Sequence, residues 1–446
     1  SGATIGDAFN RWDDVEVHFK GEAVRSGGHG FIGIGRKKLL NILQARCEEV
    51  GVQLVFEQYV EDDQAIARKY GADLVLASDG LNSLVRKRYA ETFRPDIDTR
   101  KCRFVWLGTK KVFDAFNFIF VPTKHGWFQA HAYRFEDGTS TFIVETPEAT
   151  WKAAGIDQMS QEEGIAYCEK LFAPYLDGHP LISNASHLRG SAIWIQFPRV
   201  ICERWVHWNE IDGKRVPVVL MGDAAHTAHF SIGSGTKLAL EDAIELARTL
   251  KNVDGPLEAA LQHYEAVRSV EVLKIQNAAR NSTEWFENVA RYAGLAPEQF
   301  AYSLLTRSQR ISHENLRLRD PKWLEDYERW LAQRAGVPAA DGGRPCPPLL
   351  TPYTVRGITL KNRVGVSPTL LYSSQDGVPG AFHLVHLGSR ALGGAGLLLT
   401  EMTAVAPEAR MTPGCPGLWN DEQAAAWKRV TDFVHGHGDT RIGVQL

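Results

Sequence analysis

The stretch that decides the fold is MGDAAHTAHFSIGSGTKLALEDAIELA, residues 221–247. It follows a continuous apolar run rich in β-branched side chains, residues 216–221, which predicts a strand covered on both faces, as in a parallel sheet. Gly222 and Asp223 come at the carboxyl end of that strand, where open α/β sheets bind ligands. A helix is expected from about Gly235, with its unpaired N–H groups facing the same edge. The stretch therefore predicts a cofactor site.

The composition limits the class of protein. A chain of 446 residues is expected to hold more than one domain, and 44% hydrophobic and 23% charged residues are ordinary for a globular enzyme. A net charge of −3 gives no argument for nucleic acid or an anionic membrane. No apolar run approaches the roughly 18 residues needed to cross a bilayer, and no signal peptide opens the chain. The six scattered cysteines favour reduced thiols over disulfides or a metal site, so a cytoplasmic location is expected.

Hydrophobic periodicity outlines the first three quarters of the chain. Residues 35–51 predict an amphipathic helix, and residues 52–60 and 72–78 predict strands. Residues 102–146 alternate between apolar and polar positions with turn residues between them, which predicts an antiparallel sheet. Residues 191–208 are expected to add strands to that sheet. After Gly222 the pattern is mainly helical.

A Pro- and Gly-rich stretch, residues 337–348, predicts a linker. Beyond it, a small hairpin precedes alternating strand and helix patterns that end on a third strand, which predicts a parallel sheet or barrel. A complete (β/α)8 barrel needs about 250 residues, and only about 100 are present, so the barrel is expected to be incomplete.

A second motif lies in ASDGLNSLVRKR, residues 77–88. Asp79 and Gly80 end a predicted strand, Ser83 starts a helix, and Arg86 comes one turn later. Asp-Gly alone is usually a turn with a capping serine. The whole pattern, followed by an antiparallel sheet and by GDAAH, resembles the single-component FAD-dependent aromatic hydroxylases over residues 1 to about 290.

This resemblance implies an FAD whose ribityl hydroxyls are held by Asp223, with the helix start facing the flavin pyrimidine edge. The implied cofactor-binding residues are Arg36, Asp79, Gly80, Arg86, Gly222, Asp223, Gly233 and Gly235. Phe230 and Lys237 stand where the family has proline and asparagine, and His226 has a packing role as an equal alternative. The family opens with a Gly-x-Gly-x-x-Gly turn; none precedes Asp7, so the fingerprint is expected to have been removed with the N-terminus.

The C-terminal residues 362–446 are similar to the opening of old yellow enzyme-type FMN reductases. The matching residues are Asn362, Arg363, Ser367, Pro368, Thr369, Tyr372, Glu401 and Gln445. By this resemblance, the residues after the first strand (Ser367, Pro368 and Thr369) and Gln445 contact FMN.

The two parts together resemble the anthraniloyl-CoA monooxygenase/reductase and salicylyl-CoA 5-hydroxylase group, also through SGGHGF at residues 26–31. The resemblance implies reduction of FAD by NAD(P)H, a flavin hydroperoxide formed with O2, and hydroxylation of an aromatic acyl-CoA at ring C5. His29, His229 and Phe230 are the candidates for the catalytic pocket wall, with packing or exposure an equal alternative for each histidine. A homodimer is one assembly considered.

The acyl carrier is inferred from charge. A free aromatic acid would need a buried arginine or lysine near residues 26–31 or 226–232, and the sequence offers none there. A thioester is neutral at that point, and its CoA tail would need cations at the pocket mouth. The candidates are Arg100, Lys101, Lys110 and Lys111, for which a solvated strand edge is the alternative.

The predicted fold class is thus mixed: α/β and α+β, with a partial Rossmann-like FAD-binding domain, an antiparallel substrate-binding sheet and the first strands of a TIM barrel. The predicted domains are residues 1–336, a linker at 337–349, and residues 350–446. Two other functions stay open: an FMN ene-reductase with a degenerate flavin domain as a docking module, and a non-catalytic fragment of a larger enzyme.

Overall fold

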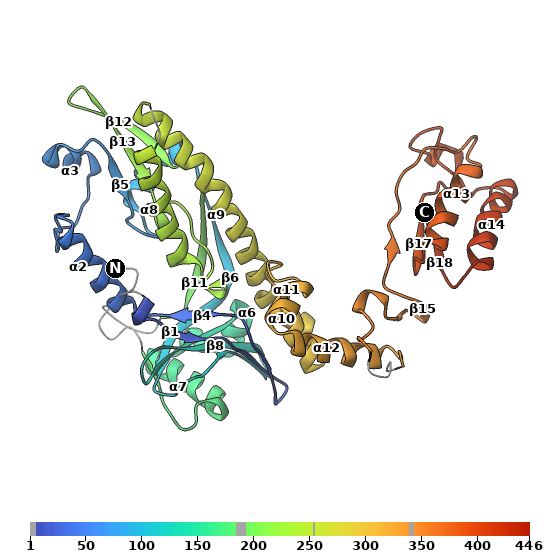
Figure 1. The fold of residues 1–446 in the computed structure, drawn as a ribbon, viewed down its shortest axis with the longest axis horizontal. Coiled ribbons are helices and arrows are strands. Elements are labelled where there is room, and N and C mark those ends of the chain that lie inside the picture. The colour runs from blue at the N-terminus through green and yellow to red at the C-terminus, as the bar shows by residue number, and fades with distance from the viewer. Residues whose placement is uncertain (1–5, 184–192, 253–254, 339–342) are drawn as a thin grey trace. The chain divides into compact units, whose positions relative to one another are not determined.

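The computed structural model describes residues 6–183, 193–252, 255–338 and 343–446 (Figure 1). The contacts within the chain divide it into two compact units, Ser1–Asp320 and Pro321–Leu446. The domain boundary predicted at residues 336/337 stays a prediction. Part of the predicted linker, residues 339–342, lies outside the described residues.

The larger sheet of the first unit has the strand order β10-β6-β9-β8-β7-β2-β3, with β11 also paired to β6. All neighbours are antiparallel except β2 and β7. The antiparallel sheet predicted for residues 102–146 is confirmed. Its strands are β2 (Val15–Phe19), β3 (Glu22–Ser26), β6 (Pro95–Thr109), β7 (Phe116–Thr123), β8 (Gly126–Glu136), β9 (Thr139–Pro147), β10 (Leu181–Ser183) and β11 (Ile195–Cys202).

The alternation of side chains gives this sheet two unlike faces. One face is apolar, with residues such as Val105, Phe128 and Val144 packed on α6 (Glu148–Ala153) and α7 (Gln161–Phe172). The opposite face carries aromatic and polar residues and contacts η4 (Phe230–Ile232) and α9 (Leu257–Glu287). We call it the aromatic face. Its residues are Phe104, Trp106, Phe118, Phe120, Gln129, His131 and Glu145.

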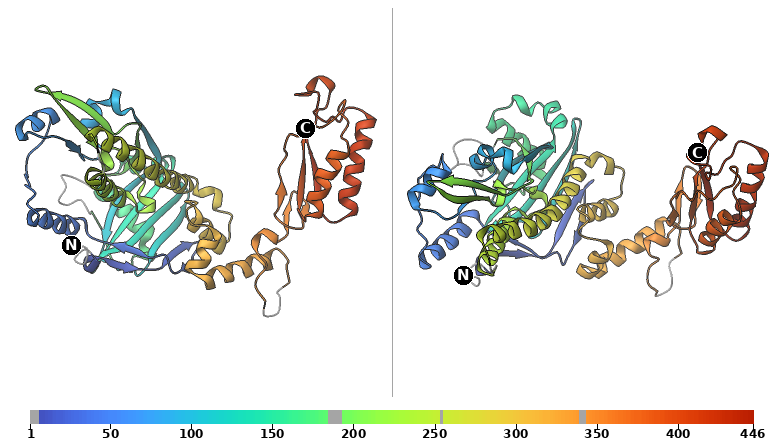
Figure 2. Two further views of the ribbon diagram at one scale, coloured as in Figure 1. Left: turned by 45° about the horizontal axis from the view of Figure 1, so that its top comes forward. Right: turned by 90° about the horizontal axis from the view of Figure 1, so that it is seen from above.

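The smaller sheet has the order β12-β13-β5. The predicted strand at 216–221 is observed as β13 (Lys214–Leu220), which runs parallel to β5 (Val75–Ala77). β12 (Val206–Ile211) pairs antiparallel with β13, so the strands predicted from residues 191–208 are divided between the two sheets. The helix α8 (Gly235–Asn252) lies beside α9, and both pack on β13 around one apolar core (Figures 1 and 2).

The strand predicted for residues 52–60 is wrong, because this segment is irregular and exposes Val52, Val55 and Phe56. A parallel strand needs a neighbour that satisfies its backbone, and β5 is an edge strand among the described residues. The helix predicted for residues 35–51 is observed as α2 (Arg36–Glu49), but it buries none of its residues.

Short elements complete the first unit. They are β1 (Asn10–Trp12), β4 (Phe31–Gly33), α3 (Asp63–Tyr70), α4 (Leu84–Arg88), α5 (Ala90–Phe93), α10 (Pro297–Thr306) and α11 (His313–Arg319).

The second unit contains the parallel sheet β16-β17-β18, whose core residues include Leu398 and Trp427. The predicted order of hairpin, strands and helices is confirmed. The elements are α12 (Pro321–Arg334), β14 (Tyr353–Val355), β15 (Ile358–Leu360), β16 (Gly365–Val366), α13 (Ala381–Leu392), β17 (Leu397–Met402), α14 (Asp421–Gly436) and β18 (Arg441–Gln445).

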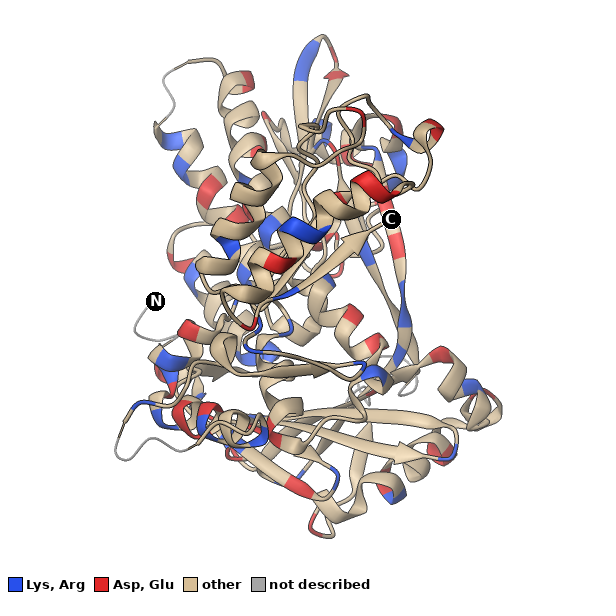
Figure 3. Ribbon diagram, turned by 90° about the vertical axis from the view of Figure 1, so that its right-hand side faces the viewer, with Lys and Arg blue, Asp and Glu red and all other residues tan. Residues whose placement is uncertain are grey.

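Acidic and basic residues are interspersed along the ribbon, with long uncharged stretches in the sheets (Figure 3). Within the described ranges, no helix is long and apolar enough to cross a membrane, and no group of His, Cys, Asp and Glu side chains could hold a metal ion.

Burial in α10 makes a direct stability prediction. Leu304 is fully buried, whereas Leu318 of α11 is 84% exposed. Leu304→Ala is expected to lower the free energy of unfolding by about 2–5 kcal/mol, because it leaves a cavity. The matched control Leu318→Ala should change it by less than about 0.5 kcal/mol. Denaturant titration measures both, and equal effects would contradict this description of the core.

Candidate functional site

The turn after β13 is fixed by one buried carboxylate. Asp242 of α8 accepts hydrogen bonds from Gly222 N at 3.0 Å, His226 Nε2 at 2.7 Å and Arg268 Nε at 2.8 Å. Burial raises the pKa of Asp242, but these partners outweigh that effect and the pKa is lowered. A Cβ on Gly222 would lie 3.2 Å from Cβ of Ala239, and its φ of +59° also favours glycine. His226 therefore packs against the turn and holds it in place.

The two sequence motifs meet at Arg86, which is buried in α4. Its Nη1 donates to the carbonyl oxygens of Ala224 at 2.7 Å and Asp223 at 3.3 Å, and its Nη2 donates to the carbonyl of Leu81. Asp79 Oδ2 accepts from Leu84 N at 2.8 Å, and Ser83 Oγ accepts from Arg86 N at 2.9 Å, so both side chains cap α4. The Asp-Gly-x-x-Ser-x-x-Arg motif thus ties the end of β5 to the turn after β13.

The carboxylate of Asp223 stands at the open edge of this turn. It has no hydrogen-bond partner within the described ranges, and solvent reaches it. The surrounding protein raises its pKa, against the opposing charges of His226, Arg36 and Arg86. Asp223, Arg36 and Arg86 are thus close enough to interact electrostatically.

The glycines of the predicted site lie at the end of η4, at the start of α8 and in the Asp-Gly-x-x-Ser-x-x-Arg motif. Gly233 (φ +62°) ends η4, Gly235 begins α8, and Gly80 (φ +78°) follows Asp79. Lys237 forms an ion pair with Glu241 one turn along α8.

A buried polar cluster interrupts the aromatic face. Gln129 and Glu145 are directly paired across β8 and β9, and His131 follows on the same face. Glu145 Oε2 lies 3.1 Å from His131 Nε2. Both polar atoms of Gln129, His131 Nδ1 and Glu145 Oε1 are buried without a hydrogen-bond partner among the described residues. Such atoms normally have partners, so the cluster is suited to bind a polar group.

The charge of Glu145 is retained despite complete burial. Burial raises its pKa, but the hydrogen bond from His131 and the proximity of His229 outweigh that effect, and the pKa is lowered. We name Gln129, His131 and Glu145 the Glu145 cluster. The sequence interpretation missed it, although a glutamate following FIV in a buried strand was a visible signal.

His229 and Phe230 are placed against this cluster. His229 Nε2 lies 3.6 Å from Glu145 Oε1, and its Nδ1 accepts a hydrogen bond from Ser231 N at 3.3 Å. The neutral ring therefore carries its proton on Nε2. Burial lowers the pKa of His229 to about 4. The ring centroid of Phe230 lies 4.7 Å from that of Phe104 and 5.6 Å from that of His131.

His29, the third predicted pocket residue, lies at the far end of a row of rings that runs through Phe31, Phe116 and Phe118 to His131. Its Nε2 lies 3.0 Å from Ser26 Oγ, and burial lowers its pKa to about 4. The structure thus brings His229 and Phe230 together and leaves His29 at the end of this row.

The structure differs from the predicted charge distribution in two ways. A partly buried arginine does reach the segment 226–232, because Arg307 Nη2 donates to Ser231 O at 2.8 Å. It comes from the chain after α10, about 75 residues away, so inspection of the local sequence could not find it. The four predicted cations also do not gather. Lys110 contacts Thr139 and Lys111 contacts Asp177, beyond the end of β6 opposite to Arg100.

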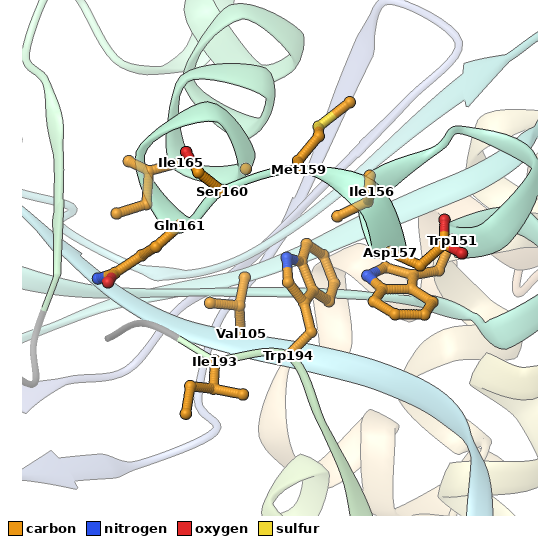
Figure 4. Close-up of a pocket in the computed structure, with 11 residues that line it drawn as sticks. Val105, Trp151, Ile156, Asp157, Met159, Ser160, Gln161, Ile165, Ile193 and Trp194 are labelled. Atoms are coloured by element: carbon orange, nitrogen blue, oxygen red, sulfur yellow. The ribbon is translucent and has the colours of Figure 1, made fainter. Parts of the chain in front are cut away.

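A pocket of about 330 Å³ lies on the other side of the large sheet, among Val105, Trp151, Met159, Ile165 and Trp194 (Figure 4). Because Val105 belongs to the apolar face that packs on α6 and α7, this pocket is separate from the Glu145 cluster.

In the second unit, the parallel strands bring the predicted FMN residues to one edge of the sheet. Ser367, Pro368 and Thr369 follow β16, and Gln445 ends β18. Glu401 in β17 anchors the chain beyond them, since its Oε2 accepts from Leu371 N at 2.8 Å and its Oε1 lies 2.9 Å from His383 Nε2.

Comparison with known proteins gives matches over both units. Residues 348–446 match the NADH:flavin oxidoreductase / NADH oxidase family. Salicyloyl-CoA 5-hydroxylase of Streptomyces sp is 40% identical over 380 residues, covering 82% of this chain and 68% of that protein. The 3-hydroxy-4-methyl-anthranilyl-(aryl-carrier protein) 5-monooxygenase of Streptosporangium sibiricum is 32% identical, covering 68% and 76%. NADPH dehydrogenase of Bacillus cytotoxicus is 42% identical over 100 residues, covering 22% of this chain and 29% of that protein.

These matches, together with the sheets β12-β13-β5 and β16-β17-β18 that carry the sequence motifs, identify a flavoprotein oxidoreductase. The chain belongs to the family of flavin-dependent aromatic monooxygenases that includes Salicyloyl-CoA 5-hydroxylase, and its residues 348–446 match the NADH:flavin oxidoreductase / NADH oxidase family. Its cofactors are FAD and FMN, with NAD(P)H as the typical reductant.

The buried histidines predict how stability depends on pH. In the native state burial lowers the pKa values of His29 and His229 to about 4, while the unfolded chain takes up these protons near pH 6.5. The unfolded state therefore binds more protons between these values. Stability should fall as the pH drops from about 6.5 to about 4, by up to about 1.4 kcal/mol per pH unit for each group.

His229→Gln and His29→Gln are each expected to make this slope shallower, whereas the exposed His263→Gln serves as the control that keeps it. Denaturant titrations at several pH values measure the slope independently of the absolute stability. An unchanged slope in both buried-site variants would show that these histidines titrate normally in the native protein.

Proposed function

We propose that this chain hydroxylates an aromatic acyl thioester, such as salicyloyl-CoA or anthraniloyl-CoA, at ring C5 with O2 and NAD(P)H. The observation that carries the proposal is the Glu145 cluster, a set of buried polar atoms without hydrogen-bond partners among the described residues, on an aromatic surface that contacts His229 and Phe230 in the loop after Asp223. The named relatives act on a salicyloyl thioester and on an anthranilyl group of a carrier protein.

FAD fits the edge formed after β13. Asp223, whose carboxylate has no hydrogen-bond partner among the described residues, would hold the ribityl hydroxyls, Gly222 would let the backbone approach closely, and the start of α8 at Gly235 would favour negative charge on the flavin. Arg36 supplies positive charge near Asp223. Gly233 shapes the turn before α8, while Asp79 caps α4 and Arg86 ties the Asp-Gly-x-x-Ser-x-x-Arg motif, which includes Gly80, to the turn after β13. When bound and reduced, FAD supplies the activated oxygen; the protein supplies position and a dry surrounding.

The aromatic face would hold the substrate ring. Phe104, Trp106 and Phe230 provide apolar walls, and the ring's hydroxyl or amino group donates to Glu145 Oε1, which accepts no hydrogen bond among the described residues and lies 3.6 Å from His229 Nε2. An ionised carboxylate that accepts this hydrogen bond raises the electron density of the ring, which favours attack on its para carbon. Neutral His229 helps to keep this carboxylate charged, with its Nε2 proton directed toward Oε1.

The two domain assignments are also proposals. The sheet β12-β13-β5 is the Rossmann-like part of an FAD-binding domain, and β16, β17 and β18 are the first strands of a TIM barrel that binds FMN. Ser367, Thr369 and Gln445 are exposed at its carboxyl edge, free to contact FMN, with Pro368 between them. A homodimer remains a prediction.

Replacement of Asp223 tests the proposed FAD site most directly. Asp223→Ala in the full-length protein removes a charged acceptor, a loss of about 1.5–3 kcal/mol, and is expected to weaken FAD binding by roughly 10- to 150-fold. The control Asp137→Ala changes an exposed acid in the turn between β8 and β9 and should bind FAD like the parent. Titration of the apoprotein with FAD measures both, and unaltered affinity in Asp223→Ala would remove this residue from the site.

The thioester is tested by substrate comparison. NAD(P)H oxidation and hydroxylated product should be at least roughly tenfold greater, as kcat/KM, with salicyloyl-CoA or anthraniloyl-CoA than with free salicylate or anthranilate, because the free acids lack the charged contacts of the tail. Product analysis separates hydroxylation from simple NAD(P)H oxidation. Equal values for free acid and thioester would return the protein to the ordinary aromatic-acid hydroxylases.

A further inference from the structure

A polar cavity of about 430 Å³ lies between the middle of β6, the end of α9 and the chain after α10. Four basic residues and two acidic residues line it, which gives it a formal charge of +2. The basic residues are Arg100, Lys101, Arg291 and Arg307, and the acidic ones are Glu284 and Glu287. We call it the β6–α9 cavity.

Internal contacts already occupy the more buried of the two carboxylates. Glu287 Oε2 accepts from Arg100 Nη2 at 2.7 Å, and its Oε1 accepts from the backbone N of Lys101 at 2.7 Å. Arg100 Nη1 also donates to Asp98 at 2.9 Å. Arg100 Nε is nevertheless buried without an acceptor among the described residues, so one donor at the cavity wall is unused.

The other basic groups have no carboxylate partner in the part of the chain that the structure describes. The guanidinium of Arg307 donates to neutral acceptors, Ser282 Oγ at 2.9 Å, Leu304 O at 2.8 Å and Ser231 O at 2.8 Å. Burial lowers its pKa to about 10, so it remains charged at neutral pH. Lys101 and Arg291 are exposed at the mouth. This excess of positive charge favours an anionic ligand.

Arg307 also connects the cavity to the proposed ring site. Its guanidinium lies 5.0 Å from the ring centroids of Phe118 and Phe286, and it bonds to the carbonyl of Ser231, which follows Phe230. A ligand whose ring lies on the aromatic face could therefore place a charged tail among Lys101, Arg291 and Arg100.

Resting on the proposed function, we propose that the β6–α9 cavity binds the phosphate ester of the substrate's pantetheine arm. A phosphate presents several acceptor oxygens, which suits a site of converging Arg and Lys donors. CoA thioesters and carrier-protein thioesters share this phosphate. This assignment replaces the predicted set of four cations: it keeps Arg100 and Lys101, removes Lys110 and Lys111, and adds Arg291 and Arg307.

The test is the double variant Lys101→Ala/Arg291→Ala in the full-length protein. The control is Lys110→Ala, which changes a lysine just after the end of β6 that does not line the cavity. Calorimetry measures binding of CoA, phosphopantetheine and pantetheine without any acyl group. The double variant should bind CoA and phosphopantetheine roughly tenfold or more weakly, the weak pantetheine binding should be the same as in the parent, and Lys110→Ala should match the parent throughout. Equal melting temperatures exclude misfolding.

Turnover supplies the second readout. For the double variant, kcat/KM should fall with salicyloyl-CoA and salicyloyl-phosphopantetheine relative to salicyloyl-pantetheine, mainly through KM. In the parent, the CoA and carrier-protein thioesters are compared to identify the natural source of the arm. If the parent binds CoA through these residues but hydroxylates no thioester, the proposed function fails and the cavity assignment stands.

Three results would overturn the assignment. Unchanged phosphopantetheine binding in the double variant removes the phosphate from this cavity. A loss confined to CoA shows that the cavity recognises the nucleotide end. An equal loss with pantetheine shows a general packing effect.

Discussion

The arrangement of the first unit depends on the buried carboxylate of Asp242. Asp242 belongs to α8 and joins this helix to two other elements. It accepts hydrogen bonds from Gly222 and His226 in the loop after β13, and from Arg268 of α9. A buried carboxylate is stable only when its charge is compensated, and here all its partners belong to elements that must meet. The position of Asp223 at the sheet edge, and the start of α8 beside it, follow from this junction.

The long helix α9 then connects the cofactor edge to the substrate sheet. Its first half packs with β13 and α8 through Leu261, Tyr264 and Val272. Its last turns place Trp285 and Phe286 on the aromatic face, and Glu287 at the β6–α9 cavity. Because one rigid element contacts both sheets, the Glu145 cluster and the turn of Asp223 have a fixed relation, which a reaction between a flavin and a substrate ring requires.

Much of the fold was predictable because it depends on local patterns. The apolar run that became β13, the alternating segments of the large sheet and the βα units of the second unit all carry their periodicity within a few residues. The strand predicted for residues 52–60 failed because strand formation there depends on a neighbour and not on its own apolar residues.

The candidate site was less accessible from sequence. Asp223 and Arg86 belong to recognisable motifs, and in the structure the guanidinium of Arg86 donates to the carbonyl oxygen of Asp223. The Glu145 cluster and Arg307 were missed because their meaning arises only from partners far along the chain: Glu145 meets His229, and Arg307 meets Ser231. Charge counted along the sequence likewise could not separate Arg100 from Lys110, since Arg100 lies within β6 beside Glu287 whereas Lys110 follows the last residue of β6 and contacts Thr139.

The central claim is that one chain combines an FAD-dependent hydroxylase with an FMN-binding module. The most direct measurement is the identity and amount of flavin released by denaturing the purified full-length protein, separated by chromatography. The account predicts one FAD and one FMN per chain. FMN alone, with no FAD bound even after addition of excess FAD, would contradict it and would favour an FMN reductase that uses the first unit only for docking.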